Sequence, residues 1–335
     1  MMNRVVVPKS RIKEVLESFI SVARLVAPVK NEKTLLFDEV KDAGDVILND
    51  EITYKSPKEF LFPQTERIMT FTKDGKVVSC EDSRKTIIFG VRPCDLQALK
   101  VMTAVFTQGK YSDKYFESKL KNTVIVGFGC LSEKTGCFCA ERNIDKGYSR
   151  ECDIFLSDNG DSSYTADIIT EKGAELLEGL NLEAADNVSG VSMINSEKAN
   201  VKAIEINAGE KELFEQIDWE RISEKCLGCG TCTYICPTCH CFGFRDVVEN
   251  GDSVRYRCWD SCMYPKFTLH ASGHNPRVSK KERFRQRIMH KYLYVKQNFG
   301  YIACTGCGRC IRSCPAGMNI KTVLEGIQEE MHCDQ

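Results

Sequence analysis

The sequence lacks any long hydrophobic run. Its longest apolar stretches are a few residues, far short of the ~20 residues that a membrane-spanning helix needs. The first ten residues lead into a charged amphipathic segment, residues 12–17, rather than into the apolar centre of a secretory signal. A strong excess of either charge is also missing, because the formal net charge is −1. These absences argue against a membrane span and a nucleic-acid partner, and they predict an unexported, cytoplasmic protein.

Histidine is scarce, whereas cysteine is abundant. The five histidines show no metal-binding spacing such as H-x3-H. A full GxGxxG fingerprint after a predicted strand is absent, so no nucleotide site is indicated and hydride chemistry would belong to a partner. Nineteen cysteines occur among 335 residues. Because cytosolic reductants keep thiols reduced, this number predicts bound metal rather than a disulfide framework.

One internal repeat organises eight of the cysteines. The pattern C-x2-C-x2-C-x3-C-P begins at Cys226 and again at Cys304. Its short spacers let three thiols wrap one face of a [4Fe-4S] cubane, and the fourth, stopped by proline, ligates the other cluster in two-cluster proteins. The alternative is a pair of zinc knuckles, but zinc sites commonly pair two C-x2-C hooks. The repeat predicts two clusters, one held by Cys226, Cys229, Cys232 and Cys314 and the other by Cys304, Cys307, Cys310 and Cys236.

Four further cysteines follow two predicted strands. The β-branched runs at residues 86–91 and 123–128 are typical of buried strands, and residues 95–107 between them are typical of a helix. If the strands are adjacent and parallel, their carboxyl ends bring Cys94 and Cys130 together. We expect a third cluster site there, made by Cys94, Cys130, Cys137 and Cys139. The alternative is a set of buried, inert cysteines.

Another group of cysteines matches no complete ligand template. Cys239 and Cys241 follow the first motif directly, and Cys258 and Cys262 flank Trp259-Asp260-Ser261. They could hold a metal, or they could pack around the first cluster and tune its potential. Packing is favoured because the template is incomplete, which leaves Cys239, Cys241 and Cys262 as the weaker metal candidates.

The remaining patterns predict a mixed α/β domain over residues 1–205 and an α-helical, ferredoxin-like dicluster domain over residues 206–335. The segment between the two cysteine motifs is expected to be rich in helix, including a long basic helix over residues 279–298. Charged helix faces are usually solvated, although this one could also dock an acidic partner. Its basic residues are Arg283, Arg285, Arg287, His290 and Lys291.

Several longer motifs resemble a known family. They are Ser56-Pro57-Lys58-Glu59-Phe60-Leu61-Phe62-Pro63, Val91-Arg92-Pro93-Cys94-Asp95-Leu96, Gly136-Cys137-Phe138-Cys139, Cys236-Pro237-Thr238-Cys239-His240-Cys241-Phe242, Trp259-Asp260-Ser261-Cys262 and Gly273-His274-Asn275. In this order, over residues 50–318, they resemble the iron–sulfur subunits that include the anaerobic sulfite reductase A subunit and the sulfhydrogenase beta subunit.

The resemblance implies an electron relay without substrate chemistry of its own. It implies a hetero-oligomer with two partners, a flavin subunit that oxidises NAD(P)H and a catalytic subunit such as a sulfite reductase or hydrogenase. The family's eight cluster ligands carry over onto the eight cysteines of the repeat, and its N-terminal cysteines match Cys94, Cys130, Cys137 and Cys139. Two rival hypotheses stay open: the N-terminal domain binds a flavin and the chain is itself a reductase, or the chain is a redox-sensing iron–sulfur protein.

Overall fold

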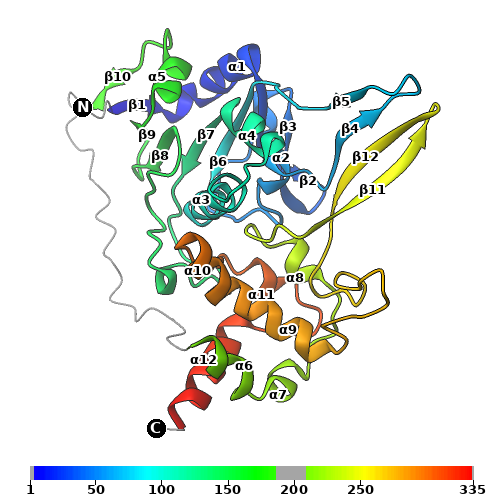
Figure 1. The fold of residues 1–335 in the computed structure, drawn as a ribbon. Helices are drawn as coiled ribbons and strands as arrows, with labels where there is room; N and C mark the ends of the chain where they lie inside the picture. Colours follow the sequence, from blue (N-terminus) through cyan, green and yellow to red (C-terminus); the bar gives the residue numbers. More distant parts are fainter. Residues whose placement is uncertain (1–3, 186–208, 334–335) are drawn as a thin grey trace.

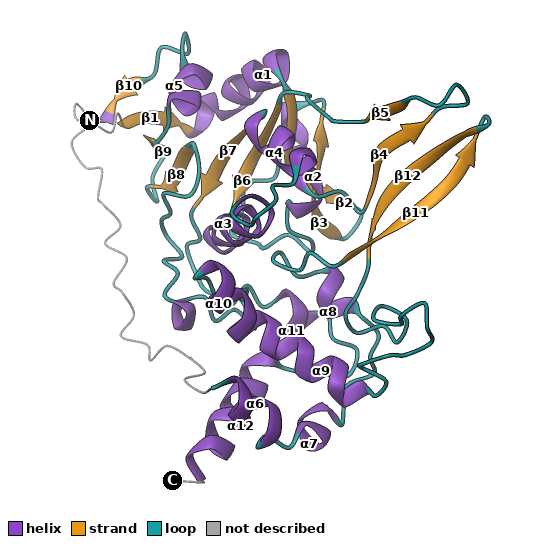
Figure 2. Ribbon diagram, in the orientation of Figure 1, coloured by secondary structure: helices purple, strands orange, loops and turns teal. Residues whose placement is uncertain are grey.

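The computed structural model describes residues 4–185 and 209–333 (Figures 1 and 2). The expected domain boundary, between residues 205 and 206, lies outside these described residues. In the described parts, every helix is too short or too polar to cross a lipid bilayer.

An eight-stranded sheet forms the N-terminal part of the molecule. Its central strands β2, β6, β7 and β8 run parallel, and antiparallel strands extend both edges. In spatial order the strands are β10 (Glu183–Ala184), β1 (Arg4–Pro8), β9 (Ser163–Ile168), β8 (Ile154–Asp158), β7 (Thr123–Phe128), β6 (Thr86–Val91), β2 (Arg24–Asn31) and β3 (Thr34–Val40).

Helices cover both faces of this sheet. They are α1 (Ile12–Val22), α2 (Lys58–Leu61), α3 (Pro93–Thr107), α4 (Lys114–Lys121) and α5 (Glu171–Leu177), with short 3-10 turns η1 (Lys9–Arg11), η2 (Ala43–Asp45) and η3 (Ala140–Arg142). Ile87 and Phe89 of β6 pack in the core under α1 and α5, whereas Ile88 packs in the core under α3 and α4. Alternate side chains of a strand point to opposite faces, so a strand buried on both sides is apolar throughout. The predicted β6–α3–β7 unit and the mixed α/β class are confirmed.

A second, four-stranded sheet projects as an arm in Figure 1. Its order is β11 (Phe242–Glu249), β12 (Asp252–Trp259), β4 (Thr65–Phe71) and β5 (Val77–Ser79). Asn250 and Gly251 join β11 to β12 with φ of 51° and 85°, as a type I′ hairpin turn requires. The segment between the two cysteine motifs therefore contains a long hairpin as well as helices, which the expectation of a helix-rich module did not include.

The C-terminal part is otherwise helical and lies below the large sheet in Figure 1. Its helices are α6 (Glu210–Glu215), α7 (Trp219–Ser223), α8 (Thr231–Tyr234), α9 (Lys280–Met289), the π-helical turn η5 (His290–Tyr294), α10 (Val295–Phe299), α11 (Arg309–Arg312) and α12 (Ile320–Cys333). The predicted long basic helix is the continuous run α9–η5–α10. Val295 of α10 packs on Val101 of α3, and this contact joins the helical part to the sheet.

Candidate metal centre

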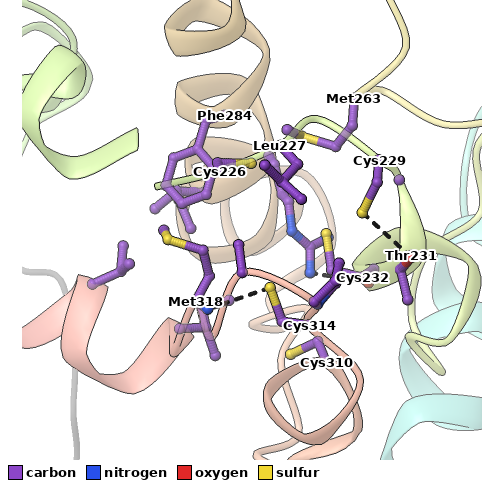
Figure 3. A pocket seen from close by; sticks show the side chains of 17 residues that line it. Cys226, Leu227, Cys229, Thr231, Cys232, Met263, Phe284, Cys310, Cys314 and Met318 are labelled. Carbon is purple, nitrogen blue, oxygen red and sulfur yellow. Dashed lines mark hydrogen bonds between the residues drawn. The ribbon is translucent and has the colours of Figure 1, made fainter. Parts of the chain in front are cut away.

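The first cysteine loop and the end of the second loop surround one hollow (Figure 3). Cys226 and Cys229 line it from the α7–α8 connection and Cys232 from α8 itself, and Cys314 lines it from a loop almost ninety positions further along the chain. Backbone N–H groups already point at two of these sulfurs. Gly228 N donates to Cys226 Sγ at 3.4 Å, and Met318 N donates to Cys314 Sγ at 3.3 Å. The set is the one that the repeat predicts for one cubane, and Cys310 also reaches this hollow.

A second hollow lies next to the first and has the reciprocal composition. It is lined by Cys304, Cys307 and Cys310 from the second loop and by Cys236 from the end of the first. Cys310, Arg287 and Ile320 line both hollows, so the two are neighbours. The fourth cysteine of each motif thus lies at the other motif's hollow, as the proline after it predicts.

The two loops are built alike because their glycines stand at matching positions. Gly228 and Gly230 have φ of 67° and 78°, and Gly306 and Gly308 have φ of 64° and 71°, a region that side chains disfavour. A one-turn helix, α8 or α11, follows each loop. A Cβ at Gly306 or Gly308 would lie 2.5 Å from a backbone oxygen of residues 136–138, so the second loop also packs tightly against the N-terminal domain.

Burial and local partners set the protonation of these thiols. Thr231 hydrogen-bonds to Cys229 Sγ and lowers the pKa of that exposed thiol. Burial raises the pKa of Cys232, and it raises the pKa of Cys307 to about 11. A hydrogen bond from Cys239, together with the cation of Lys291, lowers the pKa of Cys236 well below its usual range. Cys236 is therefore prepared as a thiolate, the form that binds iron.

Buried cations surround the second hollow, and their partners are sulfur atoms and neutral oxygens. Lys291 Nζ donates to Cys236 Sγ at 3.1 Å, to Thr238 Oγ1 at 3.0 Å and to Ala303 O at 2.6 Å. Arg287 donates to Cys239 Sγ at 3.5 Å and to Cys232 O at 3.1 Å. Both side chains are at most 4% exposed.

Burial disfavours the charged forms of Lys291 and Arg287, but the neighbouring thiolates outweigh it and raise the pKa of both groups. A buried charge is costly unless it is paired. A cubane with four thiolate ligands is anionic, and it would supply the missing partner here. The donor set and its charge therefore fit a [4Fe-4S] cluster.

Lys291 lies within the π-helical turn η5. This turn interrupts the regular helix at His290–Tyr294, and such turns are frequent at functional sites. Lys291 and Tyr292 within it are both buried. Burial, with the neighbouring Cys304, raises the pKa of Tyr292 well above its usual range.

The four N-terminal cysteines gather at the carboxyl ends of β6 and β7, against the second loop. Cys130 lies close enough to Cys94, Cys137 and Cys139 to interact electrostatically with each of them. Cys307 is also close enough to Cys94 to contribute to the raised pKa of that thiol, and Cys137 Sγ lies 3.5 Å from Cys307 O. Burial raises the pKa of Cys94 and Cys130, and it raises the pKa of Cys139 to about 12. The parallel pairing of β6 with β7 produces this convergence.

Cys239, Cys241, Cys258 and Cys262 do not share one set of partners. Cys241 and Cys262 hydrogen-bond to each other, which lowers the pKa of Cys241 and raises that of Cys262, while Cys239 contacts Cys236. Cys258 lies in β12 opposite Gly243. Across the described residues, no three Cys, His, Asp or Glu side chains are arranged to hold a single metal ion.

Comparisons with known proteins agree with this geometry. A family described as a 4Fe-4S dicluster domain matches residues 225–318, which contain both cysteine motifs. The sulfhydrogenase 2 subunit beta of Pyrococcus furiosus is 32% identical over 320 residues, which cover 92% of this chain and 93% of that subunit. This chain belongs to the sulfhydrogenase beta subunit family. The resemblance predicted from the motifs is confirmed, and the chain is an iron–sulfur electron-transport protein of the oxidoreductase class. No solved structure matches it.

In this family member, sequence reasoning missed the buried cations. The basic face of residues 279–298 was expected to be solvated, yet Arg283, Arg287 and Lys291 are all buried. Their spacing of four places them on one side of the helix. On that side Arg287 and Lys291 donate to cysteine sulfurs, and Arg283 donates to the backbone carbonyl of Met263. A stripe of cations in the place of an apolar stripe, beside a cysteine motif, is the signal that could have revealed them.

Proposed function

We propose that this chain relays electrons through two [4Fe-4S] clusters. Cys226, Cys229, Cys232 and Cys314 hold one cluster, and Cys304, Cys307, Cys310 and Cys236 hold the other. The observation that carries this proposal is the reciprocal lining of the two adjacent hollows, in which each loop contributes its last cysteine to the other. When bound, the clusters supply one-electron transfer, and the chain's own residues hold them close together in a largely buried setting.

A third cluster extends the relay into the N-terminal domain. Cys94, Cys130, Cys137 and Cys139 are its ligands. Cys94 and Cys137 lie close to Cys307, which supports a row in which this cluster follows the second one. The first cluster then forms one end of the row and the third cluster the other. A linear row of this kind suits a subunit that works between two partners.

The partners proposed are a flavin subunit that oxidises NAD(P)H and a catalytic subunit, in a cytoplasmic hetero-oligomer. The support is the kinship with a protein named as a subunit of a sulfhydrogenase. In this arrangement the dicluster module, ferredoxin-like in its ligand pattern, transfers electrons and performs no substrate chemistry. A flavin that purifies with the isolated chain would favour the rival hypothesis, in which the chain is a reductase by itself.

Iron content tests the number of clusters. The anaerobically purified chain should contain about twelve irons with three cubanes and about eight with two. Cys130→Ser should remove about four irons from the twelve, because it removes a ligand of the third cluster alone. Cys80→Ser is the matched control, since Cys80 lies beside Thr70 in the second sheet, away from the three thiol sets. Zinc in place of iron, or fewer than about eight irons in the wild type, would contradict the relay.

Lys291→Met should lower the midpoint potential of the second cluster. The ammonium group lies 3.1 Å from Cys236 Sγ, and its positive charge favours the more negative, reduced cluster. A unit charge about 5 Å away at an effective dielectric constant of about 20 contributes roughly 3 kcal/mol, so the shift is on the order of 100 mV. Redox titration followed by electron paramagnetic resonance measures it. Lys281→Met on the same helix removes an exposed cation and should leave the potential unchanged; equal shifts in both variants would contradict the assigned role.

A further inference from the structure

One ligand thiol of the proposed relay reaches the surface. Among the eight cysteines assigned to the two clusters, Cys229 is exposed, whereas the other seven are buried or half-buried. Its neighbour Leu227 is 67% exposed. The first cluster would therefore meet the outside of the molecule at Cys229, and electrons would pass to or from a partner most directly there.

An aromatic hollow opens beside this cysteine, between the N-terminal domain and the first loop. It encloses about 320 Å³, within the range of ligand pockets. Four rings line it, together with Cys229 and few polar groups. The lining residues are Tyr54, Lys55, Gln64, Cys229, Thr231, Tyr234, Ile235, Trp259 and Tyr264.

Three of the rings are held in place by the protein. The indole N–H of Trp259 donates to Phe62 O at 3.0 Å, and Lys58 Nζ lies 3.8 Å from the centre of the ring system. Tyr234 donates to Trp259 O at 3.3 Å. Tyr264 donates to Cys229 O at 3.4 Å and leans against Gly230, where a side chain would collide with it. The walls are thus fixed before anything binds, which reduces the ordering cost of binding.

The chemistry of the hollow selects its occupant. Aromatic walls favour a flat aromatic ligand, and a cluster beyond Cys229 exchanges single electrons. Nicotinamides transfer hydride, whereas flavins perform both hydride and one-electron chemistry. Lys55 is the one charged residue of the lining, 40% exposed and 3.8 Å from Glu59, and its cation complements the negative charge of a reduced flavin ring.

We propose that this hollow receives the isoalloxazine ring of a flavin held by a partner subunit, and that electrons pass between that ring and the cluster at Cys229. The inference rests on the relay function proposed above. Each transfer oxidises the reduced ring by one electron and reduces the cluster by one. No covalent bond forms between them, and the proton that the oxidised ring loses goes to water. The hollow offers walls for the ring and no glycine-rich loop for a phosphate among its lining residues, so the flavin is presented by the partner and not retained by this chain.

The test measures how fast the cluster-loaded full chain is reduced by photoreduced lumiflavin, a flavin ring without phosphate, from the bleaching of cluster absorption. Gln64→Trp places a large side chain among the residues that line the hollow and should slow this reduction about tenfold, the loss expected for one stacking contact. Tyr111→Trp, at a site 79% exposed elsewhere, should leave the rate unchanged. Reduction of every variant by dithionite should also stay unchanged, because that small reductant needs no ring-shaped site.

An unchanged lumiflavin rate in Gln64→Trp would overturn the proposal. If this variant loses its clusters, Tyr54→Ala removes one wall at the exposed rim and should slow the same reaction; an unchanged rate there overturns it equally. A stoichiometric flavin that stays on the wild-type chain through desalting after incubation with FMN would overturn the assignment of the flavin to a partner. If dithionite bleaches no cluster absorption even in the wild type, the relay function itself has failed.

Discussion

Replacing Cys236 by alanine should remove the cluster of the Cys304 loop and leave the cluster of its own loop in place. Cys236 follows Cys232 closely in sequence, yet it lines the hollow of Cys304, Cys307 and Cys310. The proline after it ends the loop, so the thiol points away from the three cysteines before it. Iron content should fall by about four atoms, the content of one cubane.

Double variants identify which cluster has been lost. Cys236→Ala combined with Cys304→Ala should lose no more iron than either change alone, because both remove ligands of one cluster. Cys236→Ala combined with Cys229→Ala should lose about eight irons, because two clusters are affected. The opposite pattern would show that each motif holds its own cluster. Cys314→Ala is the corresponding variant of the second motif. Combined with Cys229→Ala it should lose no more iron than either change alone, because both remove ligands of the first cluster.

Replacing Arg309 by methionine should produce the largest loss of stability that we predict. Arg309 and Asp95 form a bidentate ion pair, with distances of 2.6 and 2.8 Å, and each residue is 1% exposed. Arg309 also donates to Thr53 O at 2.9 Å and to Thr53 Oγ1 at 3.0 Å. Removing one partner of a buried pair leaves an uncompensated charge and costs about 3–5 kcal/mol. Urea unfolding followed anaerobically by far-UV circular dichroism measures this change.

Two comparisons separate the buried charge from a general effect of losing arginine. Arg84 pairs with Asp82 at the surface and its side chain is 64% exposed, so Arg84→Met should change the free energy of unfolding by less than about 1 kcal/mol. Adding Asp95→Asn to Arg309→Met removes the orphaned charge and should recover part of the loss. If Arg309→Met and Arg84→Met have equal effects, the buried ion pair does not make the contribution to stability that is predicted for it.

Local patterns predicted much of the fold and the content of the site. The apolar run at Thr86–Val91 indicated a strand covered on both faces, because a half-exposed strand would alternate. The two C-x2-C-x2-C-x3-C-P motifs predicted which cysteines surround each hollow, because short loops leave few ways to direct three thiols. The hairpin of β11 and β12 was not predicted, although its turn, Asn250-Gly251, is a strong hairpin signal.

Long-range contacts could not be read in the same way. The spacing of Arg283, Arg287 and Lys291 is the same for a solvated helix face and for a face buried in the protein, so the pattern alone left both open. The pairing of Asp95 with Arg309 joins positions 214 residues apart. The sequence around either residue does not indicate which residue it pairs with. The aromatic hollow beside Cys229 likewise combines Tyr54 with Tyr264 and Trp259, which are distant in sequence.

By itself, the sequence determined the family, the iron–sulfur character, the eight cysteines of the repeat and the parallel unit that leads to Cys94 and Cys130. These features depend on covalent spacing and on strand periodicity, which act over a few residues. The tertiary structure decided which cations lie beside the thiols, how the N-terminal cysteines contact the second loop, and which cysteine of the repeat reaches the surface. Those features depend on burial, and burial is a property of the packed chain because it is the sum of contacts between segments far apart in sequence.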